Sequence, residues 1–197
     1  MNCAACENKI CHQGTECGEW SDGTRLYDKE EDRRIFTAAA EVEVEGYCRL
    51  GRIEELVLFG GKLGIRRLGL AFCVGLSEEA LLLDQVLSRS FEVTSVCCKV
   101  CALSKDELGL RKIHEDRFES SCNPIGQARV LAEAKTELNV IVGLCLGHDI
   151  LFTRHSTAPV TTLVVKDRVL GHNPVAALHA SYHRRRLLPD EAGKDVP

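Results

Sequence analysis

The feature that most constrains the fold of this chain is a regular alternation of short apolar runs and helical patterns after residue 50. Four runs are rich in strand-forming residues and span 67–73, 91–97, 139–145 and 160–166. Helical segments separate the runs, and the runs are largely apolar on both faces, which is typical of parallel strands buried between helices. The sequence therefore predicts an α/β fold with a mainly parallel sheet of about four strands, in a Rossmann-like three-layer arrangement.

Helix-initiating residues follow the predicted strands. Ser77 precedes two acidic residues, a pattern typical of a helix N-terminus, and proline favours a first helical turn at positions 124 and 174. The predicted helices span approximately 26–47, 53–63, 77–89, 106–114, 124–138, a short segment from 149, and 174–186.

Composition divides the chain into three segments. Residues 1–24 contain four cysteines and few aliphatic residues, so we expect a metal-binding knuckle that is ordered by its metal or by docking. Residues 25–186 contain the predicted strands and helices, and they form the α/β domain with a cysteine-lined site. Residues 187–197 are rich in charge and predict a flexible tail.

Charge and hydropathy exclude several classes of function. The net charge of the 197-residue chain is −4 and no basic stripe is present, so we expect no nucleic-acid partner. No run approaches the ~20 apolar residues that span a bilayer, and the N-terminus has no secretory apolar segment, so we expect a cytoplasmic protein without a membrane partner. In that compartment, an odd set of eleven cysteines indicates metal ligands or redox thiols rather than disulfides.

Cysteines gather where the predicted strands end. In open α/β sheets, binding sites form outside the carboxyl ends of the strands, and helix N-termini at these turns stabilise thiolates. Glycines 75 and 147 let the backbone approach a bulky cofactor there and offer N–H groups to its sulfur atoms. The thiols predicted to share this edge, as metal ligands, are Cys73, Cys97, Cys98, Cys101, Cys122 and Cys145. The alternative for any one of them is a small buried apolar residue.

Two histidines accompany these thiols. His148 follows Cys145 in the same predicted turn, where it is a candidate metal ligand, proton donor or hydrogen-bond partner of a ligand. His172 follows the last predicted strand and is a second candidate ligand. Residues 166–168, Lys-Asp-Arg, either hold an anion or form a solvated turn.

The N-terminal cysteines form a second candidate metal site. Cys3, Cys6, Cys11 and Cys17 have the spacing C-x2-C-x4-C-x5-C, which suits a tetrahedral zinc site or one cubane iron–sulfur cluster. The alternative is a mobile, redox-active tail.

Four motifs resemble those of a family of uncharacterised cysteine-rich bacterial and archaeal proteins that are described as metal-binding. They are CCKVC at 97–101, CNPIGQA at 122–128, VGLCLGHD at 142–149 and KDRVLGHNP at 166–174. The resemblance implies metal binding and transfers no activity. The positions that it singles out are Cys122, Asn123, Cys145, His148, Asp149, His172 and Asn173, and Asn123 thereby joins Gly75 and Gly147 as a cofactor-binding candidate.

Three functions fit this pattern. Six thiols at one edge exceed the needs of tetrahedral zinc, so the leading hypothesis is a protein with an iron–sulfur centre, a redox or metal-handling role and a redox protein partner. Zinc is the alternative metal. The second hypothesis is a thiol- or zinc-dependent enzyme that uses an edge cysteine such as Cys98, with His148 as proton donor. The third is an interaction module whose loops are joined by zinc.

Overall fold

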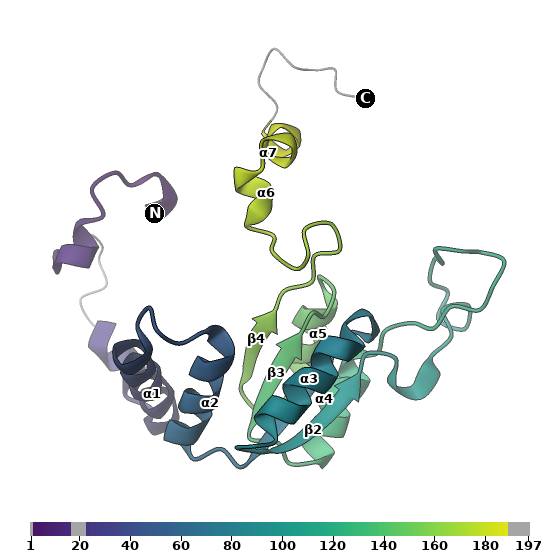
Figure 1. Cartoon of the computed structure of the whole chain (residues 1–197), viewed down its shortest axis with the longest axis horizontal. Helices are drawn as coiled ribbons and strands as arrows, with labels where there is room; N and C mark the ends of the chain where they lie inside the picture. Colours follow the sequence, from purple (N-terminus) through teal and green to yellow (C-terminus); the bar gives the residue numbers. More distant parts are fainter. Residues whose placement is uncertain (1, 17–22, 189–197) are drawn as a thin grey trace. The chain divides into compact units, whose positions relative to one another are not determined.

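Four parallel strands form one sheet in a computed structural model that describes residues 2–16 and 23–188 (Figure 1). The strands are β1 (Arg67–Phe72), β2 (Glu92–Cys97), β3 (Leu138–Val142) and β4 (Val160–Val164), in the spatial order β2-β1-β3-β4. All neighbouring pairs are parallel. The predicted α/β fold with a parallel sheet is therefore confirmed.

Helices cover both faces of this sheet. Helix α3 packs against β1 and β2, and α4 packs against the same two strands and against α5. The chain moves one way from β1 to β2 and the other way from β2 to β3 and β4, so right-handed crossovers place α3 on one face and the other two on the opposite face. The α-helices are α1 (Glu30–Gly46), α2 (Arg52–Leu63), α3 (Ser77–Leu87), α4 (Pro124–Glu133), α5 (His148–His155), α6 (Ala176–His179) and α7 (Ser181–Leu187).

The core has two halves because alternate strand residues point to opposite faces. Leu68 and Leu70 of β1 belong to the half that includes α3, whereas Ala71 belongs to the half that includes α4 and α5. All three residues are fully buried. Burial of each leucine stabilises the fold by roughly 1.5–3 kcal/mol, so the central strand anchors both helical layers.

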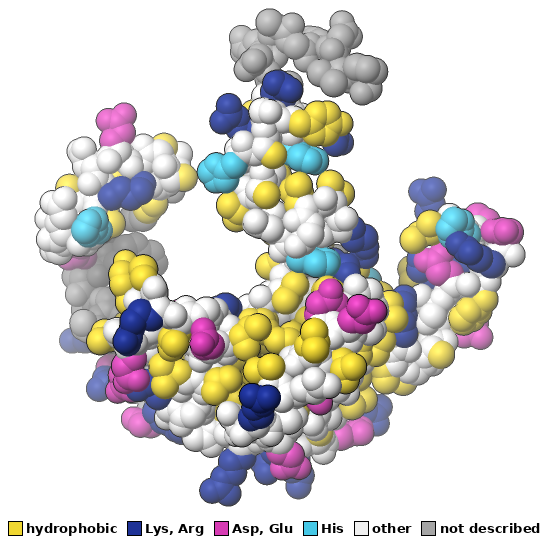
Figure 2. All heavy atoms as spheres, in the orientation of Figure 1, with side chains coloured by type: hydrophobic (Ala, Val, Ile, Leu, Met, Phe, Trp, Pro, Cys, Tyr) yellow, Lys and Arg dark blue, Asp and Glu magenta, His cyan; other side chains and the backbone are white. Residues whose placement is uncertain are grey.

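The predicted helix at 106–114 is wrong. Residues 103–121 form an arm that projects from the sheet, closed at its base by an antiparallel bridge between Ser104 and Ser120 (Figure 1). An ion pair joins Lys105 to Glu119 within the arm. The arm has charged side chains of both signs beside exposed apolar ones (Figure 2). Because Leu108 and Leu110 find no core and stay half-exposed, there is no apolar face to stabilise a helix.

Two other helices are shorter than predicted. Helix α4 ends at Glu133, and Lys135 follows with a positive φ of 54° that no helix continues. The last predicted helix is divided into α6 and α7 because Ala180 between them is extended.

The chain divides into two compact units, residues 1–45 and 46–197. The first contains the short 3-10 turns at Cys3–Ala5, Ile10–Gln13 and Gly23–Tyr27, and Tyr27 stacks on Phe36 of α1 with ring centroids 4.2 Å apart. The second contains the sheet. Within the described ranges, no helix is both long enough and apolar enough to cross a membrane. Most of the predicted tail, 189–197, lies outside the described residues.

Candidate thiol site

The site lies where the direction of chain crossover reverses. Strands β2 and β3 pair with opposite edges of β1, so the carboxyl ends of β1 and β3 flank the point at which open α/β sheets bind ligands. Cys73 directly follows β1, Cys98 directly follows β2, and Cys145 lies three residues after β3. Cys122 precedes Asn123, the N-cap residue of α4. Four elements thus supply one thiol each to this edge.

Backbone hydrogen bonds fix these segments to one another. The Cys73 N–H donates to the carbonyl of Val142 at 3.1 Å, and the Cys98 N–H donates to the carbonyl of Phe72 at 2.8 Å. The Asn123 N–H donates to the carbonyl of Cys98 at 2.8 Å. The thiols therefore occupy positions that the end of the sheet defines.

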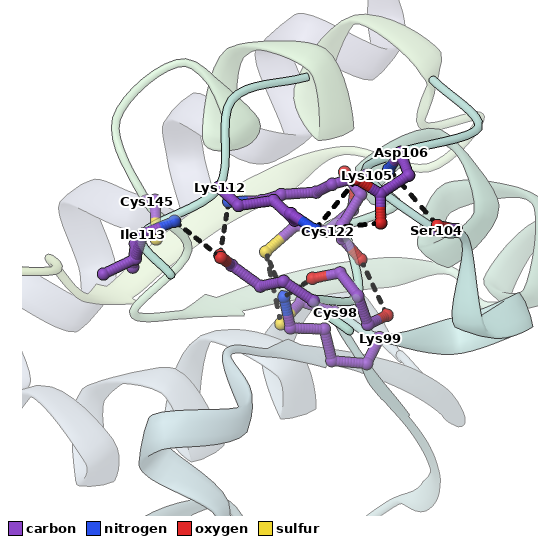
Figure 3. A network of polar contacts seen from close by, with 12 residues as sticks. Cys98, Lys99, Ser104, Lys105, Asp106, Lys112, Ile113, Cys122 and Cys145 are labelled. Carbon is purple, nitrogen blue, oxygen red and sulfur yellow. Dashed lines mark hydrogen bonds and ion pairs between the residues drawn. The ribbon is translucent and has the colours of Figure 1, made fainter. Parts of the chain in front are cut away.

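Three of the thiols form a hydrogen-bonded series with Cys98 at its centre. The Sγ atoms of Cys98 and Cys122 lie 3.7 Å apart (Figure 3), and Cys98 and Cys73 lie close enough to shift the pKa of one another. The Val74 N–H donates to the Cys98 Sγ at 3.3 Å. Cys98 is 2% exposed and Cys73 is 6% exposed, whereas Cys122 is partly exposed. Only the last member of the series is open to solvent molecules.

Three cationic side chains accompany the thiols. The Lys99 Nζ lies 3.5 Å from the Cys122 Sγ, and an Arg168 Nη lies 3.0 Å from the Cys145 Sγ. Lys166 lies near Cys73 and lowers its pKa. Each thiol except the central one therefore has its own cation, which favours the thiolate form that binds metals and attacks electrophiles.

The electrostatics separate the three members of the series. The hydrogen bond from Cys98 lowers the pKa of Cys73 well below its ordinary value, assisted by the Gly75 N–H and by Lys166. Contact with Cys98, together with Lys99 and His148, lowers the pKa of Cys122. The two flanking thiolates and burial raise the pKa of Cys98. Of the three thiols, Cys98 therefore holds its proton most strongly.

Lys166 follows β4, and its side chain reaches Cys73 past two glycines. A Cβ atom at Gly75 would lie 3.3 Å from the Lys166 Nζ, and one at Gly143 would lie 3.6 Å from its Cδ. The sequence predicts that the Gly75 N–H points to a cofactor sulfur. In the structure this N–H acts on the Cys73 sulfur and lowers its pKa. Because neither glycine has a side chain, there is space for the lysine side chain to extend to Cys73.

The loop after β4 orients Arg168. The Asp167 N–H donates to the His172 Nδ1 at 3.1 Å, and the His172 N–H donates to the Asp167 carbonyl at 2.9 Å. The Asp167 carboxylate accepts from the N–H groups of Val169 and Leu170. His172 thus closes the loop that presents Arg168, and its Nδ1 is already occupied.

Three further residues predicted for the site are Asn123, Gly147 and His148, and their side chains or backbones have different roles in the structure. Asn123 caps α4, accepting from the Gly126 N–H at 2.8 Å, and its amide donates to the Val100 carbonyl. The Gly147 N–H donates to the Asp149 carboxylate. Among the described residues, the buried Nδ1 of His148 has no hydrogen-bond partner.

Cys97 and Cys101 differ from the four thiols above. In the part of the chain that the structure describes, no hydrogen bond joins either of them to the other cysteines. Cys101 is exposed, with a positive φ of 69°. In the N-terminal unit, Cys3, Cys6 and Cys11 are exposed, and the Lys9 Nζ donates to the carbonyls of Cys3 and Cys6. Cys17 lies outside the described residues.

Over residues 2–16 and 23–188, no three histidine, cysteine or acidic side chains are already arranged to hold a metal ion. Metal binding at the four thiols would require their side chains to rotate. The thiolates and their cations are in place, but the coordination geometry is not preformed.

Two residues that the sequence does not single out contribute to the site. Lys99 lies inside the C-x2-C motif, and its contact with Cys122 depends on a turn 23 residues away. Gln127 of α4 donates to the carbonyls of Phe72 and Val96 at the ends of β1 and β2. The only sequence signals are a lysine between two cysteines and a polar residue on the apolar face of a predicted helix.

Substitution of Lys99 tests the electrostatics of Cys122. In the metal-free Lys99→Met variant, loss of the nearby charge is expected to raise the pKa of Cys122 from about 5 by about one unit, which slows its alkylation by iodoacetamide about fivefold at pH 5. Lys135→Met is the matched control, because Lys135 lies before β3, at the opposite end of that strand from Cys145. Equal alkylation rates for Cys122 in the two variants would contradict this account.

Comparison with known proteins identifies relatives of the chain. A family model described as "Protein of unknown function (DUF1847)" matches residues 11–163. The Uncharacterized protein MJ0455 of Methanocaldococcus jannaschii is 45% identical over 192 residues, which cover 95% of this chain and 98% of the relative. No solved structure matches the chain.

Proposed function

We propose a metal-binding function for this chain, which belongs to the DUF1847 family, as its resemblance to an uncharacterised cysteine-rich family predicts. The ligands are Cys73, Cys98, Cys122 and Cys145, and the bound group is an iron–sulfur cluster with a redox role. One observation supports the proposal most strongly. Four thiols lie at the edge of the sheet where the direction of chain crossover reverses, and three of them have a cationic side chain beside them.

Arg168 connects the four thiols electrostatically. Its pKa is raised by the hydrogen bond to Cys145 and also by the thiolates of Cys73 and Cys122. Cys98 interacts with both of those thiols. The donor set is thus all sulfur, which suits iron–sulfur clusters and zinc better than hard cations.

The lowered pKa values of two thiols also favour metal binding at this edge. Metal ligands must be deprotonated thiols, and two of the four already have lowered pKa values. Cys98 releases its proton when metal binds. Four thiols complete a cubane cluster, so we assign His148, which lies near Cys122, to hydrogen-bond the cluster rather than to coordinate it.

The cations favour the reduced state of such a cluster. A cubane with four thiolate ligands is an anion that gains a further negative charge on reduction, so nearby positive charge raises its reduction potential. Arg168→Gln is expected to lower the potential by tens of millivolts in an anaerobic redox titration. Arg154→Gln, at the far end of α5, is the matched control. An unchanged potential in Arg168→Gln would show that this arginine does not face the cluster.

The N-terminal cysteines are a second, separate proposal. Cys3, Cys6 and Cys11 lie on two short turns, and Cys17 is the fourth donor that the sequence offers. We assign to them a tetrahedral zinc or one cluster.

Metal and sulfide analysis tests the main proposal. The chain is purified anaerobically, as wild type and with all four N-terminal cysteines replaced by serine. Iron, acid-labile sulfide and a visible charge-transfer spectrum are expected in both. Zinc without iron or sulfide in both would reject the iron–sulfur assignment.

A further inference from the structure

We propose that the metal-free chain reduces low-molecular-weight disulfides, with Cys122 as the attacking thiol and Cys98 as the resolving thiol. The activity goes beyond the metal centre and uses two of its ligands when no metal occupies them. The two functions are tested on different forms of the chain, so either can fail alone.

The geometry of the pair carries the proposal. The two Sγ atoms lie 3.7 Å apart, and a disulfide needs about 2.05 Å between them. Three hydrogen bonds hold the two backbones together. The Ser121 N–H donates to Leu103, the Asn123 N–H to Cys98, and the Asn123 amide to Val100. The two thiols are thus held as neighbours although 24 residues separate them.

Access assigns the roles. Cys122 is partly exposed and lies just before the N-terminus of α4, so a disulfide in solution reaches this thiol first. Cys98 is 2% exposed, so a substrate disulfide reaches it only after Cys122 has reacted. A buried thiol behind an accessible one is the arrangement that resolves a mixed disulfide.

The reaction balances in two steps. The Cys122 thiolate attacks one sulfur of the substrate disulfide, the S–S bond breaks, and one substrate thiolate leaves and takes a proton from solvent. Cys98, giving up its proton, then attacks the Cys122 sulfur, and the second substrate thiolate leaves with a proton. The substrate gains two electrons and two protons, and the chain gains the Cys98–Cys122 disulfide.

The surroundings of Cys122 restrict the substrate to small disulfides. Cys122 lies at the base of the arm, and the Lys99 Nζ also donates to the Ser120 carbonyl at 2.6 Å, which holds the arm base beside the thiol. Because Cys122 is only partly exposed and lies beside the arm base, we expect it to react faster with a slim disulfide than with a bulky protein disulfide.

The test uses the full chain after metal removal and complete reduction. It is treated with 2-hydroxyethyl disulfide and mapped by trypsin digestion and mass spectrometry. A cross-link between peptides 90–99 and 118–129 is expected. In Cys98→Ser, the mixed disulfide is expected to accumulate on Cys122, about tenfold faster than on the exposed Cys101 of the same chain.

Two matched variants distinguish this pair from its neighbours. Cys97→Ser is expected to keep the cross-link, because Cys97 shares peptide 90–99 but not the contact with Cys122. Cys122→Ser is expected to lose it, with circular dichroism checking that both variants fold. A cross-link that persists in Cys98→Ser, one that joins Cys98 to Cys73, or equal reaction of Cys122 and Cys101 would overturn the proposal.

Discussion

Replacing Cys98 by serine is expected to reduce the iron bound at the sheet edge at least about tenfold. Cys98 is the central thiol of the series and interacts with both Cys73 and Cys122. A serine hydroxyl does not ionise near neutral pH and is a poor ligand for iron–sulfur clusters. The measurement is iron and sulfide per chain, in a background without the N-terminal cysteines so that only the edge site contributes.

The matched control is Cys101→Ser in the same background. Cys101 belongs to the same C-x2-C motif but is exposed and has no hydrogen bond to the described thiols of the site. Its replacement is expected to leave the iron content unchanged. If Cys101→Ser lost the metal and Cys98→Ser kept it, the ligand assignment would be wrong.

Replacing Gly143 by alanine is expected to destabilise the fold by about 3 kcal/mol. Gly143 has a φ of +64°, where a side chain costs roughly 1–2 kcal/mol. The new Cβ would also lie 2.0 Å from the Leu76 Cδ1. Leu76 is 2% exposed within the core and has little room to move, so the overlap adds about 1–3 kcal/mol.

The Gly147→Ala variant distinguishes backbone strain at a positive φ from the overlap with Leu76. Its φ is +86°, but a Cβ there would meet no atom within 4 Å. Gly147→Ala is therefore expected to cost only the backbone term of roughly 1–2 kcal/mol. Urea unfolding of the metal-free variants measures both values. Equal losses in the two variants would show that the Leu76 contact is unimportant.

Local patterns suffice to predict the sheet but not its ends. The apolar run at 139–145 predicts a strand that reaches Cys145, yet β3 ends at Val142 because Gly143 takes a left-handed conformation. Similarly, 106–114 has helical composition, but without a core to pack against it forms turns of the arm. In both cases, tertiary packing overrides local preference.

The thiol edge itself follows from the sequence because strand ends and cysteines coincide. The prediction that Cys73, Cys98 and Cys122 share one edge rests on parallel topology, which periodicity indicates. The positions of the cationic side chains beside the thiols cannot be predicted from strand ends and periodicity. Lys166 follows β4 and reaches Cys73 after β1, across the intervening β3, so only strand order reveals the pair.

X-ray absorption at the iron edge tests the central claim most directly. The sample is the anaerobically purified chain without its N-terminal cysteines, so that iron at the sheet edge gives the signal. The account predicts a first coordination shell of sulfur alone, with iron neighbours beyond it, as expected for a cluster held by Cys73, Cys98, Cys122 and Cys145. A first shell dominated by nitrogen and oxygen would contradict the account.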